Sequence, residues 1–261
     1  MDMPPSGIVY DMSNEEYHKQ VGYSSSAIKT VCKQSLAHYM AQKPLGDSPA
    51  FALGSAVHAT LLEPARDLVT KGPKTRASKL FKDLYNNRED DQVVLTEVEY
   101  YVHHKMCQSA LKNDTCNKIL TDSRRVTESS IFVTDKVTGL NLKTRPDLYI
   151  PETGQLFDIK TTIDASPTGF AEQVGKYAYH IQAAFYVLTC KKAGLKAKEF
   201  NFIAVEKTAP YITHLHKVSP ELLKEATEKV EETLAHIAEA NKSGVFGTGW
   251  GDYSTLKVGD F

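Results

Sequence analysis

A change of hydrophobic period near residue 126 constrains the fold of this chain more than any other feature of its sequence. Before this point apolar residues recur at helical spacing, and after it they alternate as in half-buried strands. The segments after the change predict three strands, a long helix, two strands and a final helix, in the order 125–135, 139–150, 154–162, 168–193, 199–207, 211–218 and 219–241. This order favours an α/β protein with a mixed sheet flanked by helices.

The part of the chain before the strands is predicted to be mainly helical. Serine hydroxyls and prolines mark the expected helix ends. The expected helices cover 23–44, 50–64 and 96–121. Because the sequence has no internal repeat, low-complexity tract or linker, we predict one domain over residues 1–261. Its parts are a helical region 1–122, a sheet with a central helix 123–218, and a C-terminal helix with a Gly-rich tail 219–261.

The composition indicates a globular protein. The chain has 261 residues, of which 41% are hydrophobic and 24% charged, which is enough to bury a sizeable core. No run approaches the roughly 20 apolar residues that cross a bilayer, and the first residues do not resemble a signal peptide. We therefore expect a cytoplasmic protein without membrane contact. The four cysteines lack C-x-x-C spacing and are expected to be reduced thiols: Cys32, Cys107, Cys116 and Cys190.

The net charge of −1 argues against a protein that coats nucleic acid non-specifically, since such proteins are usually basic. DNA binding would then depend on a local basic groove, on metal ions or on both. The most basic stretch is 71–88, which carries six Lys or Arg residues and one acid, Asp83. Its side chains Lys74, Arg76 and Lys79 are candidate DNA contacts, although a solvated surface explains the same pattern equally well.

Two carboxylates are predicted to face each other across a hairpin. If residues 151–154 form a four-residue loop, the register places Asp147 opposite Asp158, with Cβ atoms about 5 Å apart. Alternation along the second strand places Lys160 on the same face as Asp158, while Ile159 points into the core. The sequence therefore predicts a cluster of two acids and one lysine at this hairpin.

Carboxylates at this separation repel each other unless a positive group lies between them. A divalent cation is the natural solution, and hard oxygen ligands suit Mg²⁺, or Mn²⁺ in its place, which also engage phosphate oxygens. Lys160 would orient or help to deprotonate the water that attacks phosphorus, or stabilise charge in the transition state. The residues alone leave a second interpretation open, in which Asp158 and Lys160 form an exposed ion pair on a solvated hairpin.

Further motifs extend this pattern over most of the chain. Pro146-Asp147 followed by Asp158-Ile159-Lys160 resembles the signature of the PD-(D/E)xK nucleases. Gly54-x-x-x-His58 and Gln182-x-x-x-Tyr186 resemble two helical motifs of the RecB-like branch of that superfamily. The early Tyr-His and Ser-Ser-Ser-Ala-Ile-Lys pattern, with the late Trp250-Gly-Asp-Tyr253, is similar to RecE-type exonucleases and their phage relatives.

This resemblance implies a restriction-endonuclease-like core and a role for each motif. The implied catalytic residues are Asp147, Asp158, Lys160, Gln182 and Tyr186. The implied metal ligands are His58, which would bind the metal or lie beside it, Asp147, Asp158 and the carbonyl of Ile159. The roles of two further acids stay open, because Glu63 and Glu128 would each be either a partner of these ligands or a solvated charge. The number of bound metals also stays open, since Asp158 stands where many relatives have Glu.

The activity implied by the resemblance is a Mg²⁺-dependent 5′-to-3′ exonuclease that digests double-stranded DNA ends and leaves 3′ overhangs for recombination and repair. Such proteins form homo-oligomeric rings, a tetramer by this resemblance, and pass the overhang to a RecT-type annealing protein. They act in the cytoplasm of a bacterial or phage-infected cell. Two alternatives are a structure-selective or single-strand endonuclease with the same site, and a non-catalytic DNA-binding scaffold. An iron–sulfur cluster is not expected, because no cysteine follows Cys190.

Overall fold

A mixed five-stranded sheet forms the centre of the molecule in the computed structural model, which describes residues 6–43 and 48–250. In spatial order its strands are β10 (Thr213–Lys217), β9 (Glu199–Glu206), β8 (Gln155–Thr162), β7 (Leu148–Ile150) and β4 (Val126–Thr127). Strands β8 and β9 pair in parallel, and the other neighbours are antiparallel. The prediction of an α/β protein with a mixed sheet is confirmed.

The hairpin β7–β8 has the register that the sequence predicts. Ile150 pairs with Gln155 and Leu148 pairs with Phe157, so the four residues between the strands form the loop. The loop ends at Gly154, whose φ of +77° suits glycine. A Cβ atom there would lie 2.9 Å from the side chain of Lys196 and 3.3 Å from its backbone, so both the conformation and the space favour glycine.

Two predicted strands are each divided between two sheets. The segment 125–135 forms β4 and then β5 (Ser130–Thr134), and 139–150 forms β6 (Asn141–Thr144) and then β7. Strands β5 and β6 belong to a second sheet with β1 (Gly7–Val9), in the order β1-β5-β6. Glu128, with a φ of +49°, interrupts the first segment, and Pro146, which has no N–H to donate, lies in the second interruption. The prediction of continuous strands was therefore wrong at these two points.

Three predicted helices are each broken into two. The shorter helices are α2 (Ser25–Lys33) and α3 (Leu36–Ala41), α6 (Glu97–Lys112) and α7 (Asp114–Leu120), and α8 (Pro167–Lys176) and α9 (Tyr179–Lys192). The first two breaks occur where Ser35 and Asn113 cap the following helix through their side chains, which competes with helix continuation. The third occurs at Ala178, which has left-handed backbone angles.

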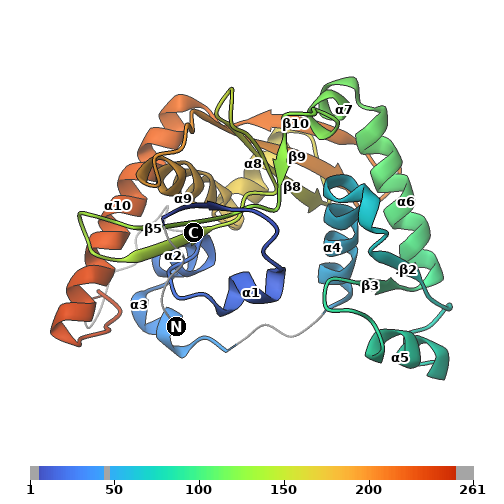
Figure 1. Cartoon of the computed structure of the whole chain (residues 1–261), viewed down its shortest axis with the longest axis horizontal. Helices are drawn as coiled ribbons and strands as arrows, with labels where there is room; N and C mark the ends of the chain where they lie inside the picture. Colours follow the sequence, from blue (N-terminus) through green and yellow to red (C-terminus); the bar gives the residue numbers. More distant parts are fainter. Residues whose placement is uncertain (1–5, 44–47, 251–261) are drawn as a thin grey trace, which may run out of the picture.

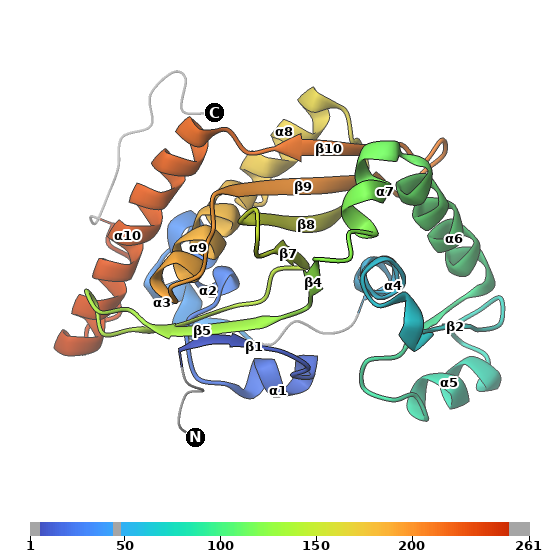
Figure 2. The ribbon, with the colours of Figure 1, turned by 45° about the horizontal axis from the view of Figure 1, so that its top comes forward.

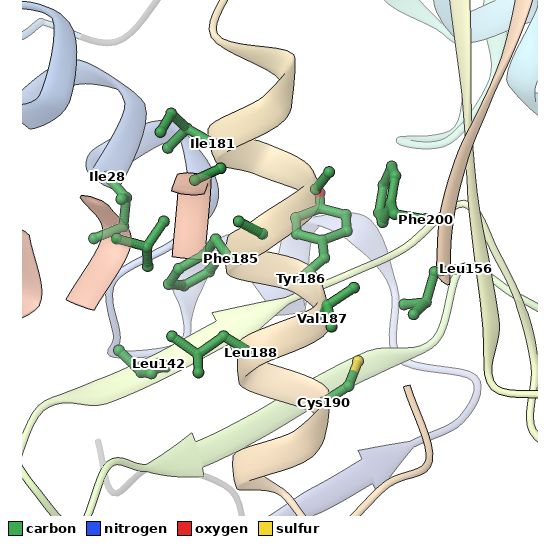
Figure 3. Close-up of a cluster of buried hydrophobic side chains, with 14 of the residues drawn as sticks. Ile28, Leu142, Leu156, Ile181, Phe185, Tyr186, Val187, Leu188, Cys190 and Phe200 are labelled. Atoms are coloured by element: carbon green, nitrogen blue, oxygen red, sulfur yellow. The ribbon is translucent and has the colours of Figure 1, made fainter. Parts of the chain in front are cut away.

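Helices cover both faces of the central sheet (Figure 1). One face packs on α2, α9 and α10 (Pro220–Ser243), and Figure 3 shows α9 in this cluster, with Phe185 and Tyr186 among its buried side chains. The other face packs on α4 (Pro49–Leu62), α6 and α7. Leu156 belongs to the first cluster and Phe157 and Ile159 to the second. The alternation along β8 therefore turns Asp158 toward α9 and Ile159 into the opposite core, as predicted.

The basic stretch 71–88 lies in a small unit beside α4 (Figure 2). The unit consists of η1 (Pro64–Arg66), the parallel strands β2 (Val69–Lys71) and β3 (Val93–Leu95), and α5 (Lys79–Asn86). Ser78 caps α5, and Phe81 is its buried anchor. This arrangement brings the basic stretch to the same side of the molecule as α4.

None of the described helices is long and apolar enough to cross a membrane. The predicted Gly-rich tail begins after α10, and the Trp250 ring lies 5.5 Å from that of His38. Tyr253, the last residue of the late aromatic motif, lies outside the described residues.

The first helix, α1 (Asn14–Lys19), is held against the second sheet by a buried lysine on β6. The Lys143 ammonium donates hydrogen bonds to the carbonyls of Tyr17 (3.0 Å), His18 (3.1 Å) and Gln20 (2.6 Å). These carbonyls lie at the C-terminal end of α1, where a helix leaves acceptors without internal partners and favours a cation. Lys143 therefore fixes the N-terminal segment to the sheet.

Replacing Lys143 with methionine is expected to lower the free energy of unfolding by roughly 2–4 kcal/mol, because buried carbonyls lose their donor. Denaturant unfolding would measure the loss, and hydrogen exchange should show faster exchange in residues 7–20. The exposed Lys136 on the neighbouring turn is the matched control, and its replacement with methionine should change neither quantity. Equal stability of the two variants would contradict this role for Lys143.

Candidate metal-dependent active site

The two predicted carboxylates are brought together by the hairpin β7–β8. Asp147 directly precedes β7, and its Oδ2 atom accepts a hydrogen bond of 2.6 Å from the backbone N–H of Ile159 on β8. Asp158 lies in the middle of β8 and is only 2% exposed. The interpretation as a hairpin with solvated charges does not fit this burial.

His58 reaches the same site from the middle of α4. Its Nε2 atom lies 2.9 Å from Oδ2 of Asp147, and its Nδ1 atom lies 2.8 Å from the carbonyl oxygen of Gly54, one turn earlier. Burial opposes protonation of the ring, but the Asp147 carboxylate outweighs it and raises the pKa of His58 to about 10. His58 and Lys160 together hold the pKa of Asp147 below its ordinary value, against the effect of burial.

Asp158 is enclosed by two side chains that point at its two oxygens. Gln182 on α9 donates from Nε2 to Oδ1 at 2.6 Å, and the Lys160 ammonium forms an ion pair with Oδ2. Oδ2 accepts no hydrogen bond of good geometry among the described residues. Burial and the nearby Asp147 raise the pKa of Asp158, and the opposing effect of Lys160 does not cancel them. Burial alone would lower the pKa of Lys160, but the two carboxylates raise it.

Tyr186 lies one turn beyond Gln182 but takes part in packing. Its ring lies 5.8 Å from that of Phe200 in the core cluster (Figure 3). Burial raises the pKa of its hydroxyl well above the ordinary value, and the negative charge of Asp158 adds to this shift. The structure thus brings His58, Asp147, Asp158, Lys160 and Gln182 into one set of direct contacts and places Tyr186 behind them.

Glu128 and Arg145 form a second layer behind Asp147. The backbone N–H of Glu128 donates to the carbonyl of Asp147 (3.2 Å), and its carboxylate accepts from Nε of Arg145 (2.8 Å). The same guanidinium donates from Nη1 to the carbonyl of Met12 (2.9 Å), which ties the N-terminal segment to the site. Burial and the charge of Asp147 raise the pKa of Glu128 to about 7. Glu128 is therefore a paired group rather than a solvated one, whereas Glu63 pairs with Arg66 at the end of α4 (2.9 Å).

A cleft of about 1040 Å³ opens beside this cluster. His58, Glu128 and Arg145 line it on one side, and residues of the small basic unit line it on the other. Among the three predicted DNA contacts, Arg76 lines the cleft but is paired with Glu99 through three hydrogen bonds (2.8, 3.0 and 3.3 Å). Lys74 and Lys79 are exposed and do not contribute to the lining.

The residues of the cluster fit a divalent cation by their chemistry. The Asp158 carboxylate is buried and the Asp147 carboxylate is partly buried, and Oδ2 of Asp158 accepts no hydrogen bond of good geometry from the described residues, although Lys160 pairs with it. Such oxygen ligands suit Mg²⁺ and Mn²⁺. No group of three or more His, Cys, Asp or Glu side chains is arranged to hold a metal within the described ranges. Instead, His58 and Lys160 supply the positive charge between the acids, so a cation would compete with them.

Sequence reasoning missed three residues around the site. Arg145 directly precedes the Pro146-Asp147 motif, and this position is the one sequence feature that could have indicated a role at the site. Lys29 on α2 donates to Oε1 of Gln182 (3.4 Å) and forms part of the early serine-rich motif. Tyr179 on α9 lies against the Lys160 ammonium, with 4.9 Å between the nitrogen and the ring centre. Nothing in the local pattern indicates the last two contacts, because each joins α9 to an element that is not its neighbour in the chain, α2 or β8.

Replacing Gln182 with methionine is expected to weaken divalent-metal binding by about 10- to 100-fold, as is usual for groups that orient a metal ligand. The variant keeps the side-chain volume but removes the side-chain amide of Gln182, which donates to Asp158. Calorimetric titration with Mn²⁺ would measure the change. Asn201, an equally buried amide on β9, provides the control, since its replacement with leucine removes a buried amide without touching the acids. Equal metal affinity in both variants would exclude this role for Gln182.

Comparison with protein families gives one match over most of the chain. The model described as a PDDEXK-like domain of unknown function (DUF3799) matches residues 24–252. No curated protein sequence matches the chain.

Comparison with solved structures gives the same fold. A structure described as a putative exonuclease from Eubacterium rectale matches with a TM-score of 0.65 and 17% identity, over 91% of this chain and 89% of that one. At this identity the similarity establishes a common fold alone. An alkaline exonuclease from Laribacter hongkongensis (13% identity, 75% of this chain and 95% of that one) and a phage-related exonuclease from Haemophilus somnus (13%, 73% and 95%) match with TM-scores of only 0.30, too low to support an argument.

Proposed function

The chain belongs to the family of PDDEXK-like domains (DUF3799), and from this we propose that it is a metal-dependent deoxyribonuclease that hydrolyses phosphodiester bonds. One observation carries the proposal. Asp147 and Asp158 meet across a buried hairpin, and Lys160 points at Asp158 from the same strand. A scaffold protein gains nothing from two neighbouring acids that repel each other, whereas a metal-dependent nuclease needs them.

The side chains divide the chemical work. Asp147 and Asp158, with the carbonyl of Ile159 and the His58 ring after loss of its proton, would hold the cation. When bound, the cation lowers the pKa of water and offsets the charge that develops at phosphorus. Lys160 keeps its proton at neutral pH, because the two acids raise its pKa, and so it would orient the attacking water and stabilise the transition state. Gln182 would fix the orientation of Asp158, and Tyr186 would support Gln182 from the core.

We further propose that the substrate is the end of double-stranded DNA, cut from 5′ to 3′ to leave a 3′ overhang. The RecE-type motifs support this reading, as does the fold shared with the Eubacterium rectale protein. From the same motifs we propose a single nuclease domain over residues 1–261, Mg²⁺ as the cofactor, a ring-shaped tetramer and a RecT-type annealing partner in the cytoplasm. The cleft beside His58 is the proposed place for the duplex, with Arg76, Lys82 and Arg145 on its walls.

The test is a nuclease assay on linear duplex DNA labelled separately at its 5′ and 3′ ends, with closed circular DNA alongside. We expect Mg²⁺-dependent release of 5′-labelled mononucleotide from the linear DNA alone, and no release in EDTA. Cutting of the circle would move the protein to the endonuclease alternative. Binding of DNA without cleavage under Mg²⁺ or Mn²⁺ would leave the non-catalytic scaffold as the better account.

A further inference from the structure

Two tyrosines form an aromatic pair where α8 meets α9. Tyr177 and Tyr179 stack with ring centres 5.5 Å apart and an angle of 27° between the rings. Between them Ala178 is buried and takes left-handed backbone angles (φ 52°, ψ 44°), which few residues other than glycine adopt. This unusual turn brings two residues of a broken helix onto one side. Tyr177 remains 45% exposed, so its outer face is open to solvent.

The aromatic pair adjoins the active site through Lys160. The Lys160 ammonium lies 4.9 Å from the centre of the Tyr179 ring, and the same ammonium pairs with Asp158. A continuous row therefore runs from the buried acid to Tyr179 and on to the exposed Tyr177. This row leaves the site toward α8, whereas the cleft lined by His58 lies toward α4.

Two more lysines approach the same rings. The Lys29 ammonium lies 5.8 Å from the Tyr179 ring centre, and the Lys176 ammonium lies 5.5 Å from that of Tyr177. Neither ammonium forms an ion pair with a carboxylate in the part of the chain that the structure describes. Burial and the neighbouring Lys160 lower the pKa of Lys29 to about 8, and an anion beside it would favour its charged form. Lysines beside aromatic rings, without a carboxylate partner in the described residues, favour the binding of an anion.

Single-stranded nucleic acid can bind both the aromatic rings and the lysines of this surface. Its bases stack on aromatic rings, and its phosphates pair with the lysines between them. A base inside a duplex has both faces covered by its neighbours, so only an unpaired or terminal base can offer a face to Tyr177. The row of contacts ends at Lys160, where the proposed function places the phosphate to be cut.

We propose that Tyr177 and Tyr179 stack an unpaired base of the DNA strand being cut, while Lys29 and Lys176 bind its phosphates. The inference rests on the proposed nuclease function and deepens it. Under this arrangement the tyrosines hold the base of the terminal nucleotide beside Lys160, where the proposed function places the phosphate to be cut.

The test uses 2-aminopurine, a base analogue whose fluorescence falls when it stacks. The probe is a duplex with three unpaired nucleotides at one end, each carrying the analogue in turn, bound to the full chain in Ca²⁺, with the DNA checked for cleavage on a gel. We expect strong quenching with the natural protein. Tyr177→Ala should abolish most of it and weaken binding roughly 5- to 100-fold, whereas Tyr177→Phe should retain both properties.

Tyr101 supplies a matched control, since it is an exposed tyrosine on α6 with the Lys105 ammonium 5.4 Å from its ring centre. Tyr101→Ala should leave quenching and affinity unchanged. Normal quenching by Tyr177→Ala would overturn the inference, and so would equal quenching of an analogue placed inside the duplex. If the natural protein cleaves DNA but Tyr177→Ala binds normally, the inference fails and the nuclease function stands. Strong quenching that requires Tyr177, without cleavage in Mg²⁺ or Mn²⁺, would preserve the stacking site and reject the nuclease.

Discussion

Replacing Lys160 with alanine is expected to lower the rate of DNA cleavage by roughly 10²- to 10⁴-fold, with little change in DNA affinity. The ammonium is the one positive side chain that points at Asp158 from the same strand. Its loss removes the group that would orient the water and stabilise the transition state, while the residues that line the cleft stay in place. Single-turnover cleavage with enzyme in excess would separate the chemical step from binding.

The chain offers a close control for this variant. Lys192 forms an ion pair with Asp135 (2.6 Å). The side chains of Lys192 and Asp135 are 20% and 3% exposed, and those of Lys160 and Asp158 are 18% and 3% exposed. Lys192→Ala should therefore lose a comparable ion pair and cleave DNA at the normal rate. Normal cleavage by Lys160→Ala, or an equal loss in both variants, would contradict a catalytic role for Lys160.

Divalent metal is expected to raise the melting temperature of the protein by roughly 5–10 °C when its concentration is 100 times the dissociation constant. At that concentration binding adds about 2.7 kcal/mol to the free energy of unfolding. The physical source is the binding of the cation by Asp147 and Asp158, which lie together only in the folded protein, in competition with His58 and Lys160. Differential scanning fluorimetry with Mg²⁺, Mn²⁺ and EDTA would measure the shift.

The shift should depend on pH in a defined direction. The pKa of Asp158 is raised in the folded protein, so its own contribution to stability is present below pH 3.8 and is lost as pH rises through the folded pKa. A cation binds the ionised form of Asp158, and the stability that it adds should therefore be largest at higher pH. The temperature shift is expected to shrink as pH falls through the pKa of Asp158.

Two variants test whether the shift arises at this site. Asp158→Asn should remove it, because the amide carries no charge to hold a cation. Asp135→Asn changes another buried carboxylate, which pairs with Lys192 and not with the residues of the site, and should leave the shift intact. An unchanged shift in Asp158→Asn would place metal binding elsewhere in the protein.

The arrangement of Asp147, Asp158 and Lys160 at the hairpin could be predicted from the sequence, because strand geometry depends on neighbouring residues. A four-residue loop sets the pairing of β7 and β8, and the two-residue period then fixes which side chains share a face. For this reason Asp158 and Lys160 lie on the side of α9 and Ile159 lies on the other. The family resemblance added His58 and Gln182, which no local pattern could join to the hairpin.

The breaks in the predicted elements had a different origin. Ser35 and Asn113 are polar residues whose side chains cap a new helix, and a sequence pattern cannot tell whether such a residue interrupts a helix or sits within it. The interruption between β4 and β5 at Glu128 exists because its carboxylate pairs with Arg145 and its N–H bonds the carbonyl of Asp147. These partners belong to other segments, so the break depends on tertiary contacts.

The sequence by itself determined the mixed sheet, the hairpin and the opposed acids, since hydrophobic period and loop length act over a few neighbouring residues. Only the tertiary structure decided which cations neutralise those acids and what surrounds them. His58 arrives from α4, Lys29 from α2, and the tyrosine pair from the turn before α9. Their positions depend on how helices distant in the chain pack on the two faces of the sheet, which is settled by the burial of whole elements rather than by any local pattern.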